Sequence, residues 1–301
     1  MWVTPVRLIG VRNTHLLVAV ALATSFAAPA ALAQTQLLGV EFRDGTFGGK
    51  NARLFDVDPI TGVASNPRFT GSDVLLGIAQ QDDAGPLFAL TDDIGQVNGA
   101  GAASSLITID PTTGATAVVG GTGLTLSEGD LDFDPVGGGL LGVSTQNGVV
   151  SLFDLDVATG AATGVRTLDV TGDGSGLAFA PDGSLYVLDT TVDGQPTQAF
   201  LYEVDPATAA ILDTVTLPLG LGNVAGIDFA DDGTLFLADG DFNGTDSLYT
   251  VDLATGATTT IGETVTTDVF GGLGGLEFAT VPEPASLALL GIAGFSLVRR
   301  R

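Results

Sequence analysis

Cysteine is absent from this chain of 301 residues, and histidine and methionine occur once each, as His15 and Met1. Without cysteine there are no disulfide bonds and no thiolate chemistry. Because the only histidine is at position 15, the rest of the chain has no imidazole for general acid–base catalysis, a Ser-His-Asp triad, or a zinc or copper site of the usual ligand type. Residues 34–280 are left with carboxylates, hydroxyls and three tyrosines.

Basic residues are also few. Residues 34–280 contain 34 acidic residues against five basic ones, a net charge of −29. Such a charge repels nucleic acid and anionic lipid, so we expect no nucleic-acid partner. It attracts divalent cations, basic proteins or cationic polymers, and it also keeps an exported protein soluble. The five basic residues are Arg43, Lys50, Arg53, Arg68 and Arg166.

A nine-residue motif occurs five times. In its fullest form it is the stretch 248–256, Leu-Tyr-Thr-Val-Asp-Leu-Ala-Thr-Gly, and the other copies begin at residues 54, 106, 152 and 201. The spacings of 52, 46, 49 and 47 residues match one four-stranded propeller blade per repeat. Each copy alternates apolar and variable positions and then ends in Asp, often Pro, and Thr-Gly, which predicts a strand followed by a hairpin turn.

A second half-repeat precedes each copy. Residues 176–189 and 226–239 each read as two short strands joined by Pro-Asp-Gly or Asp-Asp-Gly, and residues 130–144 and 77–90 are looser versions. The full unit is therefore four strands.

The two ends of the repeat region complete one another. Residues 37–42 match the second strand of a unit and residues 275–279 match the first, so we expect these two segments to pair and close the ring. The sequence predicts an all-β, five-bladed β-propeller over residues 34–280. The loops between second and third strands, residues 43–52, 92–105, 190–199 and 240–247, are expected to gather at one face and carry any binding.

Residues 1–33 have the features of a secretory signal peptide. Arg7 and Arg12 precede an apolar stretch, and the small-residue site ending at Ala33 predicts cleavage by signal peptidase before Gln34. The alternative is a retained membrane anchor, but the apolar run is shorter than the roughly 20 residues that a span needs.

The C-terminus has three parts in order: Pro282-Glu283-Pro284, an uncharged stretch from 285 to 298, and Arg299, Arg300 and Arg301. Residues 281–301 resemble the PEP-CTERM sorting signal of Gram-negative, exopolysaccharide-producing bacteria. The resemblance implies that an exosortase-type membrane protease reads the Pro-Glu-Pro motif after secretion. The apolar stretch would then hold the chain transiently in the inner membrane, with the arginines on the cytoplasmic side. A generic C-terminal tail anchor is the alternative.

The repeats are similar to those of bacterial propellers of the YVTN and quinoprotein-like superfamily, through stretches such as 185–189 and 201–205. Relatives of that kind include lactonases, lyases and binding modules, so the resemblance implies the fold and no single activity.

One set of carboxylates stands out. The third position of the first-strand motif holds Asp132, Asp228 and Glu277 in three units, and Ala79 and Ala178 in the other two. Because first strands line the axis of a propeller, these carboxylates are expected to converge there. They could bind Ca²⁺, or form a carboxylate pair for glycoside chemistry. The alternative is that each caps a local turn or faces solvent.

A second candidate is the loop at residues 239–246. Asp239, Asp241 and Asn243 alternate as hard-cation ligands do, a glycine follows, and Asp246 closes the segment. An EF-hand loop would need Glu at its twelfth position, which here is Thr250, so an ordinary turn-rich loop is the competing interpretation.

Together these features predict an exported protein of the cell envelope, cell surface or extracellular matrix of a Gram-negative bacterium. We expect a non-catalytic interaction or matrix protein, linked to exopolysaccharide or biofilm, with Ca²⁺ as its one candidate cofactor. The alternative is a carboxylate-dependent hydrolase or lyase acting on a carbohydrate or lactone.

Overall fold

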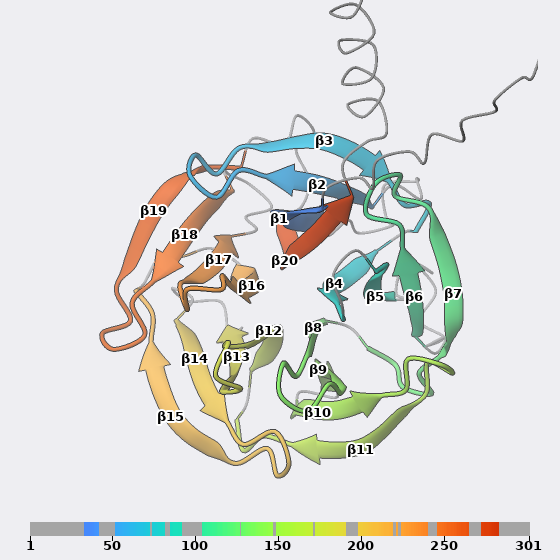
Figure 1. Ribbon diagram of the computed structural model, residues 1–301. Helices are drawn as coiled ribbons and strands as arrows, with labels where there is room; N and C mark the ends of the chain where they lie inside the picture. Colours follow the sequence, from blue (N-terminus) through green and yellow to red (C-terminus); the bar gives the residue numbers. More distant parts are fainter. Residues whose placement is uncertain are drawn as a thin grey trace, which may run out of the picture.

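The computed structural model describes residues 33–41, 52–72, 74–81, 85–91, 104–126, 128–146, 149–170, 172–190, 198–218, 221, 224–239, 246–264 and 272–282. Within these ranges, twenty strands form five antiparallel four-stranded sheets arranged around a central axis (Figure 1). The predicted five-bladed propeller is confirmed. No helix in the described ranges is long and apolar enough to cross a membrane.

The blades, from the axis outward, consist of the following strands. Blade 1 contains β20 (Leu273–Pro282), β1 (Ala33–Glu41), β2 (Arg53–Val57) and β3 (Ala64–Phe69). Blade 2 contains β4 (Leu75–Gln80), β5 (Leu87–Thr91), β6 (Ser105–Ile109) and β7 (Thr116–Gly121). Blade 3 contains β8 (Gly129–Phe133), β9 (Leu140–Gln146), β10 (Val149–Leu155) and β11 (Ala162–Thr167).

Blade 4 contains β12 (Asp173–Phe179), β13 (Leu185–Thr190), β14 (Ala199–Val204) and β15 (Ile211–Thr216). Blade 5 contains β16 (Val224–Phe229), β17 (Leu235–Asp239), β18 (Ser247–Val251) and β19 (Thr258–Glu263). The nine-residue motif thus forms the third strand of every blade and the turn after it, as predicted.

Each of these turns is built around its aspartate. In blade 5, Asp252 Oδ1 accepts the backbone N–H of Ala254 (2.9 Å), and the carbonyl of Asp252 accepts the N–H of Gly256 (2.7 Å). Gly256 has a φ of 72°, which glycine adopts without a steric penalty. The fourth copy has alanine in place of this glycine, and Ala209 takes the same left-handed conformation (φ 59°).

The turn glycine also makes the outer contact between blades. A methyl group at Gly256 would overlap the carbonyl oxygen of Thr216 on β15 of the preceding blade, and one at Gly62 would lie 2.7 Å from the carbonyl oxygen of Gly262 on β19. Backbone therefore packs directly on backbone between adjacent blades. Gly114 and Gly160 make the corresponding contacts, with Arg68 on β3 and Gly120 on β7.

Blade 1 is shared by the two ends of the described chain. β20 pairs antiparallel with β1 from Glu41 opposite Leu273 to Ala33 opposite Pro282, and β1 pairs in turn with β2. The predicted closure is confirmed, and β20 runs on to Pro282. Closing the ring pairs two strand edges, one on β1 and one on β20, that would otherwise have no partner.

Burial increases toward the axis. All five side chains of β17 are buried, whereas β15 at the rim is mostly exposed, as expected of an outer strand. The core consists of apolar clusters that extend from one blade to the next, such as the one joining Leu188 and Leu201 of blade 4 to Leu237 of blade 5. Burying one such leucine contributes roughly 1.5–3 kcal/mol, so much of the stability lies between blades.

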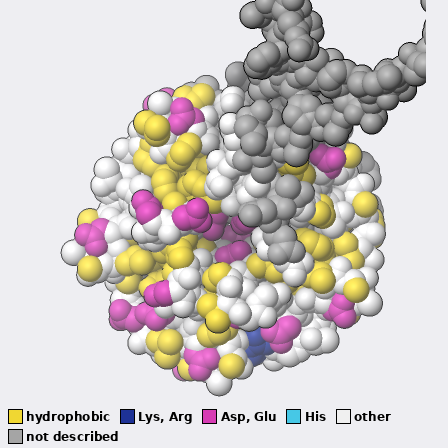
Figure 2. Space-filling view, viewed as in Figure 1, with side chains coloured by type: hydrophobic (Ala, Val, Ile, Leu, Met, Phe, Trp, Pro, Cys, Tyr) yellow, Lys and Arg dark blue, Asp and Glu magenta, His cyan; other side chains and the backbone are white. Residues whose placement is uncertain are grey.

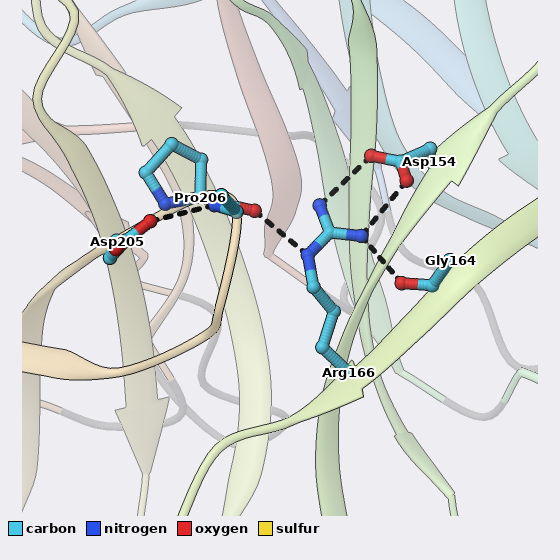
Figure 3. Close-up of polar contacts among 6 residues, drawn as sticks. Asp154, Gly164, Arg166, Asp205 and Pro206 are labelled. Atoms are coloured by element: carbon cyan, nitrogen blue, oxygen red, sulfur yellow. Dashed lines mark hydrogen bonds and ion pairs between the residues drawn. The ribbon is translucent and has the colours of Figure 1, made fainter.

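The three basic side chains in the described ranges are all engaged in ion pairs. Arg53 makes a bidentate, buried pair with Glu41 (2.7 and 2.8 Å), and Arg68 pairs with Asp56 (2.6 Å). Figure 3 shows Arg166, which donates to both oxygens of the Asp154 carboxylate and, across the blade boundary, to the carbonyl of Pro206 (2.8 Å). Each positive charge in the described ranges is thus neutralised by a carboxylate of the same chain.

Candidate functional site at the ring axis

The innermost strands β4, β8, β12, β16 and β20 surround the axis, and each contacts the next around the ring (Figure 1). Three of them bring the predicted carboxylates to this region: Asp132 from β8, Asp228 from β16 and Glu277 from β20. Asp228 and Glu277 are buried, and Asp132 is partly buried. Burial raises the pKa values of Asp228 and Glu277, and the neighbouring negative charge of Asp132 raises both further, so these carboxyl groups lie near one another as expected.

Each carboxylate also binds the backbone of the next blade. Asp132 Oδ1 accepts the N–H of the following residue, Phe133 (2.7 Å), and its Oδ2 accepts the N–H of Phe179 on β12 (2.6 Å). Asp228 repeats this pattern, with the N–H of Phe229 (2.7 Å) and that of Phe278 on β20. These N–H groups lie on the free edge of an inner strand, where no fifth strand is available to accept them.

Blades 1 and 2 are joined in a related way. Glu277 Oε1 accepts the N–H of Gln80 on β4 (3.0 Å). The side chain of Gln80 reaches back to β20: its Oε1 accepts the N–H of Thr280 (2.6 Å) and its Nε2 donates to the Thr280 carbonyl (3.2 Å). A carboxylate therefore links the inner strands at three of the five blade boundaries: 3–4, 5–1 and 1–2.

Asp130 is a fourth axial carboxylate, which the sequence analysis missed. It is buried in β8, where its Oδ2 accepts the N–H of Leu177 (3.2 Å), and it occupies space left by Gly77 of the neighbouring blade. The signal was a departure from the repeat, because Asp130 stands where the other four first strands have glycine. Those glycines are Gly77, Gly176, Gly226 and Gly275.

Burial controls the protonation of this cluster. Loss of hydration raises the pKa of Asp132 to about 7, and it raises the pKa values of Asp130, Asp228 and Glu277 well above the ordinary range. The backbone N–H groups act in the opposite direction, because they stabilise the ionised form, but burial outweighs them. The axis therefore holds carboxyl groups that retain protons at pH values where free carboxyls are ionised.

The arrangement constrains what the axial carboxylates can bind. Both oxygens of Asp132 and both of Asp228 already accept backbone N–H groups. In the ranges that the structure describes, no group of three or more His, Cys, Asp or Glu side chains is positioned to hold a metal ion. This geometry is that of a structural junction in which carboxylates hydrogen-bond to the next blade. Turn capping or exposure to solvent was the structural alternative expected from the sequence, and not a contact between blades.

The second predicted site is described only in part. Asp239 ends β17 and accepts a long hydrogen bond from the Tyr249 hydroxyl (3.4 Å), and Asp246 is buried just before β18. Asp241 and Asn243 lie outside the described residues. Cation binding by residues 239–246 remains a prediction.

The two predicted processing sites meet at one point of blade 1. Ala33 lies opposite Pro282 at the end of the β1–β20 pairing, and Gln34 lies opposite Val281. The remaining sorting residues, Glu283, Pro284 and Arg299 to Arg301, are outside the described residues.

The ring is thus a five-bladed β-propeller whose last strand runs directly into the C-terminal segment. Residues 280–301 match the family model of the PEP-CTERM protein-sorting motif. The chain therefore carries a PEP-CTERM sorting motif, which implies processing by an exosortase and sorting to the cell surface.

No curated protein matches the sequence. Among solved structures, the chain is similar to TolB from Acinetobacter baumannii, with 17% identity over 77% of this chain and 54% of that one and a TM-score of 0.47. It is also similar to the periplasmic gluconolactonase of Pseudomonas aeruginosa (17% identity, 78% of this chain and 69% of that one, TM-score 0.46). A third is a putative 6-phosphogluconolactonase from Bacteroides uniformis (15%, 77% and 84%, 0.44). This chain spans about half the length of TolB, and none of these similarities assigns a function.

Proposed function

We propose that the protein is exported, processed by an exosortase, and acts outside the cell as a non-catalytic interaction or matrix protein associated with exopolysaccharide. The export part of the proposal relies on the signal-peptide features of residues 1–33 and on the sorting motif. The non-catalytic part relies on the ring axis, where the carboxylate side chains join neighbouring blades through hydrogen bonds.

The single observation that carries the non-catalytic assignment is the use of the axial carboxylate oxygens. A catalytic carboxylate must reach a substrate atom, but Asp132 and Asp228 each hold a backbone N–H of the next blade. Freeing either carboxylate would leave that edge N–H without its acceptor. These hydrogen bonds favour a structural role for the axial carboxylates, so we assign ligand binding to the outer surface of the propeller.

A glycan array and a pull-down from extracellular polysaccharide, both with the exported full chain, test this proposal. We expect retention of the chain by one polysaccharide class and release at raised salt, since a domain with a net charge of −29 binds cationic polymers electrostatically. Retention by none of the polysaccharides would contradict the association with exopolysaccharide.

A carboxylate-dependent hydrolase or lyase is the second candidate, and one observation favours it. The pKa of Asp132, about 7, suits a general acid or base at neutral pH. Turnover of a glycan or lactone by the exported chain that disappears in Asp132→Asn and Glu277→Gln, while Asp182→Asn in an exposed turn leaves it unchanged, would establish this activity in place of the binding role.

We also propose residues 239–246 as a divalent-cation site. Added Ca²⁺ is expected to raise the thermal midpoint of the chain by mass action, and Asp241→Asn is expected to abolish that rise. An unchanged midpoint at low salt in the presence and absence of a chelator would exclude this site.

A further inference from the structure

The chain leaves the ring beside a groove. Pro282, the last residue of β20, lines a groove of about 440 Å³ together with Pro86, which precedes β5, and with Thr108, Pro111, Thr112 and Ala117 of blade 2. The first residue of the sorting motif is thus part of the groove wall.

Very little chain separates this groove from the apolar segment. Pro282 is the last strand residue and the apolar stretch begins at Ala285, so three residue steps connect them. Whatever their conformation, three steps span at most about 11 Å. Because the stretch 285–298 has only 14 residues, shorter than a comfortable membrane span, it has no length to spare outside the bilayer.

A protease that reads Pro282–Pro284 while residues 285–298 remain in the membrane must therefore lie against the ring. The surface it meets is the turn face, which we define as the face carrying the turns after the first and third strands. The described turns are residues 85–86, 134–139, 180–184 and 230–234 after first strands, and 58–63, 110–115, 156–161, 205–210 and 252–257 after third strands.

The charge of the turn face selects the partner. These turns contain no Lys or Arg, and their exposed acidic residues are Asp58, Asp110, Asp156, Asp182, Asp231, Asp232 and Asp252. Figure 2 likewise shows acidic side chains around the ring on the face in view and basic ones at a single place. Such a face is repelled by anionic lipid and attracted by a basic protein surface.

We propose that the groove beside Pro282 is a docking surface for the exosortase, which contacts the folded propeller through a basic surface while it reads the Pro-Glu-Pro motif. The inference rests on the proposed sorting function and deepens it. The recognised unit is the motif together with the turn face of blade 2, and not the motif alone.

Filling the groove tests the proposal. Ala117 is exposed on β7, so Ala117→Trp blocks the groove without disturbing the core; Thr259, the exposed residue at the same place on β19 of blade 5, gives the matched control Thr259→Trp. Pulse-chase labelling in the cells that make the protein measures conversion of the full chain to the processed form. We expect Ala117→Trp to slow conversion at least about fivefold, and Thr259→Trp to leave it unchanged.

A charge variant examines the same surface. Thr112→Lys places a cation in the exposed turn of blade 2 and should also slow conversion, whereas Ala254→Lys, at the same turn position of blade 5, should not. Equal conversion rates in both matched pairs would overturn the docking surface.

A spacer identifies why the groove matters. Six Gly/Ser residues inserted between Val281 and Pro282 move the motif up to about 20 Å from the ring. In this background Ala117→Trp should cause no further slowing, because the motif is no longer held at the groove. Slowing that persists would mean that the substitution acts elsewhere, and would overturn the proposal.

Two controls separate this inference from the function beneath it. Glu283→Ala should block conversion; if it does not, the sorting function itself fails. If Glu283→Ala blocks conversion but groove variants do not, only the docking surface fails. A photo-reactive benzoylphenylalanine at position 117 should cross-link to the exosortase, and a cross-link only to lipid or to a second copy of the chain would overturn the exosortase as occupant.

Discussion

Neighbouring blades contact each other in two places, and the two contacts are built differently. We call the contacts between first strands at the axis the inner ring, and those made by the turns after third strands the outer ring. In the outer ring, the turn after the third strand packs on the preceding blade in a similar way around the propeller. In the inner ring, carboxylates join boundaries 3–4, 5–1 and 1–2, whereas boundaries 2–3 and 4–5 have alanine at that position. Both of those boundaries have an aromatic pair, Phe88 with Phe133 (5.6 Å between ring centroids) and Tyr186 with Phe229 (5.4 Å), and boundary 5–1 has one beside its carboxylate, Phe236 with Phe278 (5.1 Å).

The difference teaches that the repeated outer contact sets the shape, while the variable inner contact sets the response to pH. Steric packing of backbone on backbone has no dependence on protonation, nor does an aromatic pair. The carboxylate junctions depend on it directly. Four substitutions test this division, in order of expected effect.

The aromatic boundary gives the largest effect. Phe88→Ala removes a buried ring from the contact with Phe133 and leaves a cavity, so we expect a loss of about 3 kcal/mol or more in the free energy of unfolding. Urea unfolding at pH 5 and pH 8 should show the same loss at both values. A loss of stability at only one of the two pH values would contradict the proposed difference between aromatic and carboxylate boundaries.

The turn glycine of blade 5 comes next. Gly256→Ala forces a left-handed φ on alanine and drives its methyl group into the Thr216 carbonyl, so we expect a cost of about 2 kcal/mol, independent of pH. Thermal unfolding of the variant beside the wild type measures it. A stability within experimental error of the wild type would show that the outer contact is loose.

The axial carboxylates should make stability depend on pH. Their pKa values are raised in the folded state, so the folded chain binds more protons than the unfolded chain between about pH 4 and pH 7. Stability is then fully present below about pH 4 and decreases as the pH rises through 7. Unfolding midpoints should be higher at pH 5 than at pH 8, and Asp132→Asn should reduce that difference.

Asp156→Asn is a suitable control for this pH series. Asp156 lies in an exposed turn of blade 3, where its Oδ1 accepts the N–H of Ala158 (2.8 Å), and the amide oxygen of asparagine preserves that bond. The variant should keep most of the wild-type dependence. An unchanged slope in Asp132→Asn would place the titrating groups elsewhere.

The smallest effect is expected at the one turn after a third strand that has alanine in place of glycine. Ala209→Gly relieves a left-handed alanine but removes a buried methyl group and loosens the unfolded chain, so the net change should be below about 1 kcal/mol. The same thermal measurement used for Gly256→Ala checks it. A large stabilisation would mean that Ala209 is strained beyond its φ angle.

The number of blades, the hairpins and the closure could be predicted because they are encoded locally. A turn such as the one at Asp252 is specified within five residues, and repetition of that signal sets the blade count. The convergence of Asp132, Asp228 and Glu277 followed from their shared position on first strands.

The partners of those side chains could not be predicted in this way. Asp132 binds an N–H 47 residues away, and Glu277 binds one 197 residues away, so no local pattern reports either contact. Asp130 was hidden because the repeat has glycine at its position, and its fit depends on the missing side chain of Gly77 in another blade. Such contacts are determined by the three-dimensional assembly.

The pairing of β1 with β20 also governs when the protein can fold. Strand β1 cannot complete its pairing before the last strand is present, because Leu37 lies opposite Phe278. Closure of the ring is therefore a late folding step that requires a non-local and intrinsically slow search. A polypeptide stalled before residue 273 would retain an unsealed edge, and such an intermediate is a natural substrate for holding chaperones and quality-control proteases.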